Sequence, residues 1–170
     1  ISGSPIQAQG SQFLPEDILT LRGPVDEFSM SKLSAELLKA DDKDVTLFID
    51  SPGGEVFQGI QLINLMDSYE GKITCVAKYA ASMAFIIMQA CDERVVLPNG
   101  IMMQHYASYA MQGQAPTITN LTKFLNEMIE LLDVRQAKRI GLSYEKFREK
   151  LVGDWWSVGQ QAVTERVVDR

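Results

Sequence analysis

Ser82 is the first residue whose type and position point to chemistry. It lies between a strand-like run at residues 72–77 and an apolar, helix-like run that continues to about Cys91. The first N–H groups of a helix have no acceptor inside the helix, and the helix dipole adds positive charge there. A nucleophilic serine needs such donors for the oxyanion that it creates. The alternative is a helix N-cap, because serine is a preferred capping residue.

His105 is the one histidine of the chain and could serve as the base that such a serine requires. A serine hydroxyl loses its proton as it attacks, so it needs a partner that titrates near neutrality. His105 follows a mostly apolar strand-like segment and precedes a polar loop. Strand ends of an open parallel sheet converge on one edge, where ligands bind. We therefore expect His105 to meet Ser82, although a histidine at a strand end can also be structural.

Gly53 and Gly54 follow a buried, β-branched strand at residues 45–49. A backbone N–H in this turn can face an oxyanion, and residues without side chains let an extended substrate approach closely. The alternative is a tight turn that only leads into the next helix.

The remaining pattern alternates strands with helices, which indicates an α/β fold with parallel pairing. Strands are expected at residues 17–21, 45–49, 72–77, 94–97, 101–105 and 167–169, with 154–157 extended and a turn at 98–100. Helices are expected at residues 29–39, 59–66, 82–91, 117–139, 143–151 and 159–165.

Composition limits the class of protein. The chain has 170 residues, a hydrophobic content of 46% and a net charge of −6, which is typical of a globular domain and argues against nucleic-acid binding. Residues 1–12 are predicted to be a flexible arm without signal-peptide character, and residues 13–170 a single domain with no membrane span. Cys75 and Cys91 fit no metal spacing and are interpreted as reduced, buried thiols of a cytoplasmic protein.

Several short segments together resemble the proteolytic subunit of the Clp protease. These segments are residues 50–54, 80–83, 97–99, 103–105, 112–115, 161–163 and 168–169. The resemblance extends over about residues 13–169. It implies a ClpP/crotonase-like fold, a ββα-type superhelix with parallel sheets, and a protruding handle helix at about residues 117–140. It also implies self-association into heptameric rings that stack in pairs and receive substrate from an ATP-dependent unfoldase.

The resemblance further implies a role for each residue singled out above. Ser82 would be the nucleophile and His105 the general base, later the general acid. Gly53 or Gly54, together with Met83, would offer backbone N–H groups to the oxyanion. The substrates would be unfolded polypeptides hydrolysed through an acyl-enzyme, without a metal or another cofactor, nucleic acid or membrane.

The family's third catalytic residue is an aspartate preceded by an arginine, and this pair falls on Glu149 and Lys150. A lysine facing the imidazole would oppose formation of the imidazolium. Three interpretations stay open: Asp154, the nearest downstream carboxylate, serves His105; another acceptor, such as a backbone carbonyl or an asparagine side chain, holds the ring; or the subunit is weak or inactive alone and works in a mixed ring. Of these, we expect Asp154 to be the third catalytic residue.

Three further activities compete with a ring-forming peptidase. The aromatic pair Trp155–Trp156 resembles the phage prohead maturation proteases, which are related to this family. A Ser–Lys peptidase, or an acyl-CoA enzyme on the same core, would instead use a helix lysine such as Lys123 or Lys138 as its base.

Overall fold

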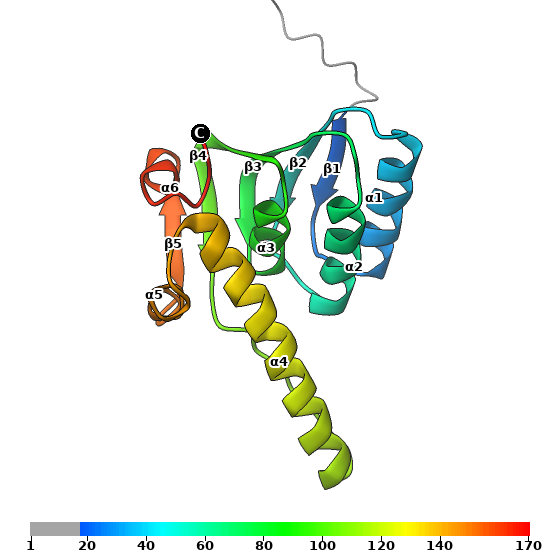
Figure 1. Cartoon of the computed structure of the whole chain (residues 1–170), viewed down its shortest axis with the longest axis vertical. Helices are drawn as coiled ribbons and strands as arrows, with labels where there is room; N and C mark the ends of the chain where they lie inside the picture. The colour runs from blue at the N-terminus through cyan, green and yellow to red at the C-terminus, as the bar shows by residue number, and fades with distance from the viewer. Residues whose placement is uncertain (1–17) are drawn as a thin grey trace, which may run out of the picture.

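The strands form one five-stranded sheet in the computed structural model, which describes residues 18–170 (Figure 1). The expected arm at residues 1–12 lies outside the described part of the chain. The strands are β1 (Ile18–Arg22), β2 (Val45–Ser51), β3 (Ile73–Ala81), β4 (Glu93–Gln104) and β5 (Trp155–Val158). They lie in sequence order; β1 to β4 are parallel, and β5 pairs antiparallel with β4. The α/β class and the parallel pairing are thereby confirmed.

Within the described residues, six helices connect or flank these strands. They are α1 (Glu27–Lys39), α2 (Val56–Asp67), α3 (Met83–Gln89), α4 (Ala115–Ile140), α5 (Tyr144–Lys150) and α6 (Gln160–Thr164). Helices α1, α2 and α3 pack along one face of the sheet, and α4 extends beyond it with its N-terminal half pointing away from the body (Figure 1). The predicted handle helix therefore protrudes from the sheet.

Local sequence explains where the main elements begin and end. In β2, every second residue is buried, as expected for a strand with one face against helices. The α1 helix starts at a capping box, in which the Asp26 carboxylate accepts from the Ser29 backbone N–H. The α4 helix ends at Gly141, whose left-handed backbone (φ 84°) suits glycine.

Two predicted elements differ from the structure. Residues 98–100, predicted to be a turn, are part of the continuous strand β4, where the pairing with β3 shifts from Val96 opposite Ala77 to Ile101 opposite Tyr79. The extra residues form a bulge, which a turn-rich sequence also favours. Residues 167–169 do not form a strand, because this segment is held by bonds to the Arg94 backbone and side chain.

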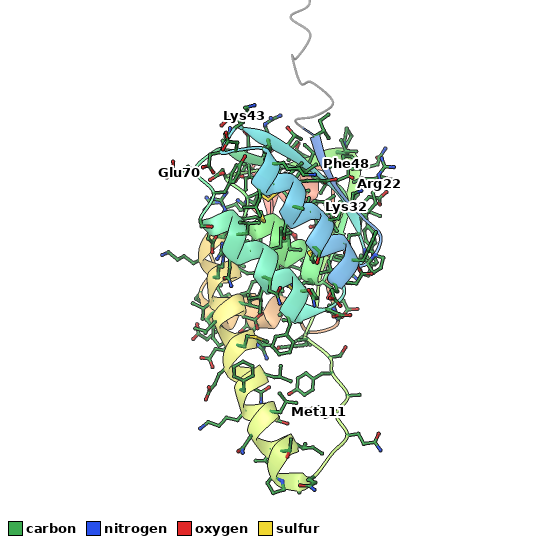
Figure 2. The ribbon with its side chains drawn as sticks, turned by 90° about the vertical axis from the view of Figure 1, so that its right-hand side faces the viewer. Arg22, Lys32, Lys43, Phe48, Glu70 and Met111 are labelled. Carbon is green, nitrogen blue, oxygen red and sulfur yellow. A yellow bond between two sulfur atoms is a disulfide. The ribbon has the colours of Figure 1, made fainter. Side chains whose placement is uncertain are left out.

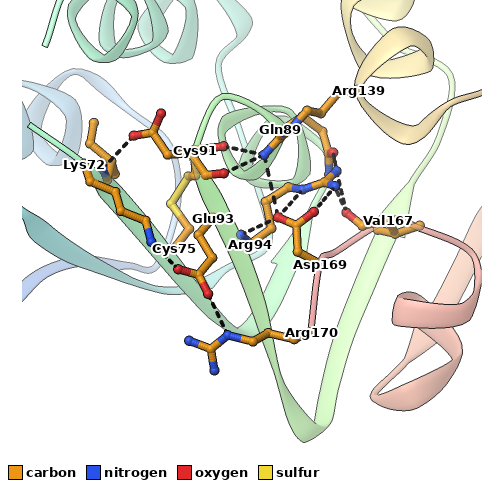
Figure 3. A network of polar contacts seen from close by, with 12 residues as sticks. Lys72, Cys75, Gln89, Cys91, Glu93, Arg94, Arg139, Val167, Asp169 and Arg170 are labelled. Carbon is orange, nitrogen blue, oxygen red and sulfur yellow. Dashed lines mark hydrogen bonds and ion pairs between the residues drawn. A yellow bond between two sulfur atoms is a disulfide. The ribbon is translucent and has the colours of Figure 1, made fainter. Parts of the chain in front are cut away.

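The interpretation of the two cysteines as reduced thiols is wrong for this structure, which joins Cys75 and Cys91 in a disulfide (Figure 3). Helix α3 reverses the chain direction, so Cys91 returns beside β3 with its Cα 5.9 Å from that of Cys75. This separation lies within the range of disulfides. The two cysteines therefore do not support the prediction that the protein is located in a reducing compartment such as the cytoplasm.

In residues 18–170, no helix combines the length and the apolar character needed to cross a bilayer.

Candidate active site

Ser82 occupies a strained turn between β3 and α3. Its backbone has φ 54° and ψ −121°, a conformation that is costly for a residue with a side chain. The Ser82 N–H donates to the Met103 carbonyl of β4 at 2.9 Å, which ties the turn to the next strand. The hydroxyl makes no N-cap hydrogen bond to α3. This sharp strand-to-helix turn presents the hydroxyl outward, as nucleophile turns of hydrolases do.

The structure brings His105 to Ser82. His105 directly follows β4, and its Nε2 lies 2.8 Å from Ser82 Oγ. Its backbone N–H donates to the side-chain oxygen of the preceding residue, Gln104, at 3.1 Å. Because β3 and β4 are parallel neighbours, their C-terminal ends place the two side chains at one edge of the sheet.

Both side chains line a cavity of about 310 Å³. This volume lies at the lower end of the range for ligand pockets. Its walls come from the turn after β2, the start of α3, the end of β4 with the following loop, and α4. The lining residues include Pro52, Gly54, Val56, Met83, Ile86, Met103, Ala107, Ile129 and Asp133.

The glycine turn lies directly against Ser82. A Cβ at Gly53 would stand 2.5 Å from the Ala81 carbonyl oxygen, so only glycine fits at this position. The Gly53 N–H donates to Ser51 Oγ at 3.1 Å. Gly54 lines the cavity, as does Met83, whose N–H is among the first of α3. Gly54 and Met83 thus both line the cavity that holds Ser82, whereas the Gly53 N–H already has Ser51 as its acceptor.

Neither Asp154, the residue expected to supply the acid, nor Lys150, at the position of the family's aspartate, lines the cavity. Asp154 is exposed, and within residues 18–170 its carboxylate forms no hydrogen bond or ion pair, with His105 or otherwise. The Lys150 amine pairs with Glu165 at 3.7 Å and lies 5.1 Å from the centre of the Trp155 ring. Lys150 is thus engaged away from the imidazole, and neither side chain lines the cavity.

A carboxylate that the sequence interpretation did not single out lines the cavity instead. Asp133 of α4 is 5% exposed, and its carboxylate pairs with Arg148 at 2.6 Å. Burial raises the pKa of the Asp133 carboxyl, and the Arg148 guanidinium opposes that rise. The available signal was its spacing: Asp133, Gln136, Ala137 and Ile140 form the buried face of α4.

The lysines of the alternative mechanism are remote from Ser82. Lys123 pairs with Glu127 near the outer half of α4, and Lys138 lines a different cavity beside Asp92. Neither lines the cavity that holds Ser82. Within residues 18–170, no cluster of three or more His, Cys, Asp or Glu side chains is arranged to hold a metal ion.

A comparison with protein families agrees with this architecture. The family model described as Clp protease matches residues 3–170, which is nearly the whole chain. The mostly parallel sheet, the turn at Ser82 and the projecting α4 helix fit the ClpP/crotonase fold. The chain therefore belongs to the Clp protease family.

Proposed function

We propose that this chain is the serine endopeptidase subunit of a ring-shaped, Clp-type protease that hydrolyses unfolded polypeptides. The observation that carries the proposal is the 2.8 Å contact between Ser82 Oγ and His105 Nε2 at a strained turn that opens into a cavity. A serine used only as a helix cap would bond its hydroxyl to the helix amides, and that bond is absent here.

The proposed reaction uses two covalent steps. Ser82 Oγ attacks the scissile carbonyl carbon while His105 Nε2 accepts its proton. His105 then donates this proton to the leaving amine as the C–N bond breaks, which leaves an ester on Ser82. In the second step His105 takes a proton from water, the hydroxide attacks the ester, and Ser82 regains its proton as the product acid leaves.

Two backbone amides would stabilise the tetrahedral intermediates. Gly54 and Met83 both line the cavity next to Ser82, from the glycine turn and from the start of α3. The loss of one oxyanion donor typically costs about 3–4 kcal/mol of transition-state stabilisation. The Gly53–Gly54 turn also lacks side chains that would keep an extended peptide away from Ser82.

Ring assembly is the second part of the proposal. Helix α4 projects from the body and exposes large apolar side chains on its surface (Figure 1). They are Leu121 (40% exposed), Phe124 (51%), Leu131 (73%) and Val134 (46%). Exposed apolar side chains on a projecting helix support a role for α4 as the handle that joins two heptameric rings. An ATP-dependent unfoldase would deliver substrates to the active sites enclosed by these rings.

The proposal is tested by hydrolysis of fluorogenic peptides and of an unfolded protein by the purified chain. We expect turnover by the wild-type protein and a loss of at least roughly 10⁴-fold in Ser82→Ala, because the nucleophile is removed. Equal turnover by both proteins would refute the proposal.

A second candidate function is a non-catalytic scaffold subunit of the same ring. It is favoured by Lys150 at the position of the family's aspartate and by the absence of an acceptor on His105 Nδ1 within residues 18–170. This candidate predicts assembled rings, seen by light scattering or electron microscopy, without peptide turnover. Robust turnover that requires Ser82 would exclude it.

A further inference from the structure

The peptidase proposed above needs a group that holds the imidazole in place, and the structure offers one candidate carboxylate. Among residues 18–170, Asp133 is the one acidic residue that lines the cavity of Ser82 and His105. It comes from α4, a helix that contributes neither the nucleophile nor the base. It stands beyond hydrogen-bonding distance of the His105 ring, across the same cavity.

One chain of contacts connects Asp133 to the residue after His105. Arg148 of α5 donates to the Asp133 carboxylate at 2.6 Å. The same guanidinium lies over the Tyr106 ring, with Cζ 4.2 Å from the ring centre, and the Tyr106 hydroxyl donates to the Arg148 carbonyl at 2.9 Å. The Asp133–Arg148 pair therefore fixes the position of Tyr106.

A second chain of contacts leads to the residue before His105. Gln136 lies one turn after Asp133 and its amide is 3.4 Å from Asp133 Oδ1. The Gln136 oxygen accepts from the Gln104 side chain at 2.6 Å, and the Gln104 oxygen in turn accepts from the His105 backbone N–H at 3.1 Å. Asp133 is thus connected to both neighbours of the proposed base.

The loop that begins at His105 also runs along α4. Figure 2 shows Met111 of this loop beside the helix, and Met111 Sδ lies 4.0 Å from Thr122 Oγ1. The Tyr109 hydroxyl donates to Asn126 at 3.0 Å. Helix α4 therefore contacts the loop that follows His105 at two further points.

We propose that Asp133 is the positioning carboxylate for His105, an inference that depends on the peptidase function proposed above. Its negative charge favours the imidazolium that forms when Ser82 attacks, and its two chains of contacts hold the backbone on either side of the ring. A buried carboxylate is costly to retain unless it is paired, and Arg148 provides that pair. Lys150, which stands at the position of the family's aspartate, is then not needed beside His105 and pairs with Glu165 instead.

The test compares second-order rates of labelling by a fluorophosphonate, which needs no unfoldase or peptide substrate. Asp133→Asn keeps the shape and removes the charge, and we expect a loss of about 100-fold or more. The matched control is Asp67→Asn, which removes a second aspartate that pairs with an arginine of α4, Arg135, outside the cavity. We expect the control to label within about twofold of the wild type.

A double variant separates positioning from simple damage to the ion pair. In Asp133→Asn with Arg148→Gln, both partners are neutral, so no unpaired charge remains. A structural role predicts recovery of the labelling rate, whereas a positioning role predicts that the rate stays low. Asp133→Glu retains the charge and should recover at least tenfold over Asp133→Asn.

The pH profile gives a readout that packing alone would not change. Removal of a negative charge disfavours the imidazolium, so the acidic limb of the labelling rate should move to lower pH in Asp133→Asn. The other titratable or charged groups of this cluster, Arg148, Tyr106 and Tyr144, are unchanged in that variant.

Three results would overturn the inference: normal labelling in Asp133→Asn, full recovery in the double variant, or a comparable loss confined to Asp154→Asn. Each of these results is informative only if the fluorophosphonate labels the wild-type protein and does not label Ser82→Ala. Failure of that comparison would instead refute the peptidase function itself.

Discussion

The two ends of strand β4 carry polar clusters of opposite character. At the start, Arg94 is 3% exposed, and its guanidinium donates to Gln89, to the Val167 carbonyl and to the Asp169 carboxylate (Figure 3). At the end, the His105 ring has one side-chain partner within residues 18–170, Ser82, and faces a cavity. A fully paired cluster fixes the chain, whereas a partly paired one beside a cavity is free to react.

The largest effect is expected at the reactive end. His105→Gln removes the proposed base, so peptide hydrolysis should fall by roughly 10⁴-fold or more. The folded protein should persist, because among the described residues Ser82 is the one hydrogen-bond partner of the imidazole. Kinetics and thermal melting measure the two properties. Turnover within tenfold of wild type would place the base elsewhere.

Next in size is the disulfide, which spans 16 residues and encloses both the Ser82 turn and α3. A loop of this length restricts the unfolded chain by about 3 kcal/mol. Cys75→Ala with Cys91→Ala should therefore lower the free energy of unfolding by about that amount. Alkylation of the denatured, unreduced wild type should modify neither cysteine; two reactive thiols would show that the bond is absent.

A smaller effect is expected at the paired end of β4. Arg94→Met removes the guanidinium that donates to the Gln89 side-chain oxygen and to the Asp169 carboxylate. The free energy of unfolding should therefore fall by about 2 kcal/mol. Turnover per folded molecule should not change, because Arg94 lies at the far end of the strand from His105. Arg22→Met, at an exposed strand end, is the control. A selective loss of turnover in Arg94→Met would contradict the division into two clusters.

The smallest effect concerns acid stability. The Arg94 side chain holds the pKa of the Asp169 carboxyl below its usual value; the Arg94 backbone N–H and the Arg139 charge act in the same direction, and partial burial opposes them. The folded value thus lies below the unfolded value of about 3.9, so this stabilisation is present above about pH 4. It disappears as the pH falls through the folded value.

The corresponding measurement compares melting temperatures of wild type and Asp169→Asn from pH 3 to pH 7. The wild type should melt higher near neutrality, and the two curves should converge toward pH 3. A constant difference across this range would show that the charge of Asp169 contributes nothing.

The sequence predicts the βα order well because each strand and helix has its own periodicity. The contact between Ser82 and His105 also follows from the predicted βα order, because neighbouring parallel strands end at the same edge of the sheet. The disulfide does not follow, because nothing in the spacing of Cys75 and Cys91 shows that α3 brings the chain back beside β3.

The position of Asp133 was equally difficult to predict. Apolar spacing along α4 emphasises residues such as Leu121 and Val134, which the structure leaves exposed. The buried face near the end of the helix instead contains two polar residues, Asp133 and Gln136. A polar residue in a core stripe is recognised only when the surface that it packs against is known.

The most direct test of the account is to treat the intact protein with a fluorophosphonate and map the modified residue by mass spectrometry. We predict a single adduct on Ser82, formed at a rate that His105→Gln lowers by orders of magnitude. An unmodified Ser82, or an adduct that forms equally fast without His105, would contradict the proposed pairing of these two side chains.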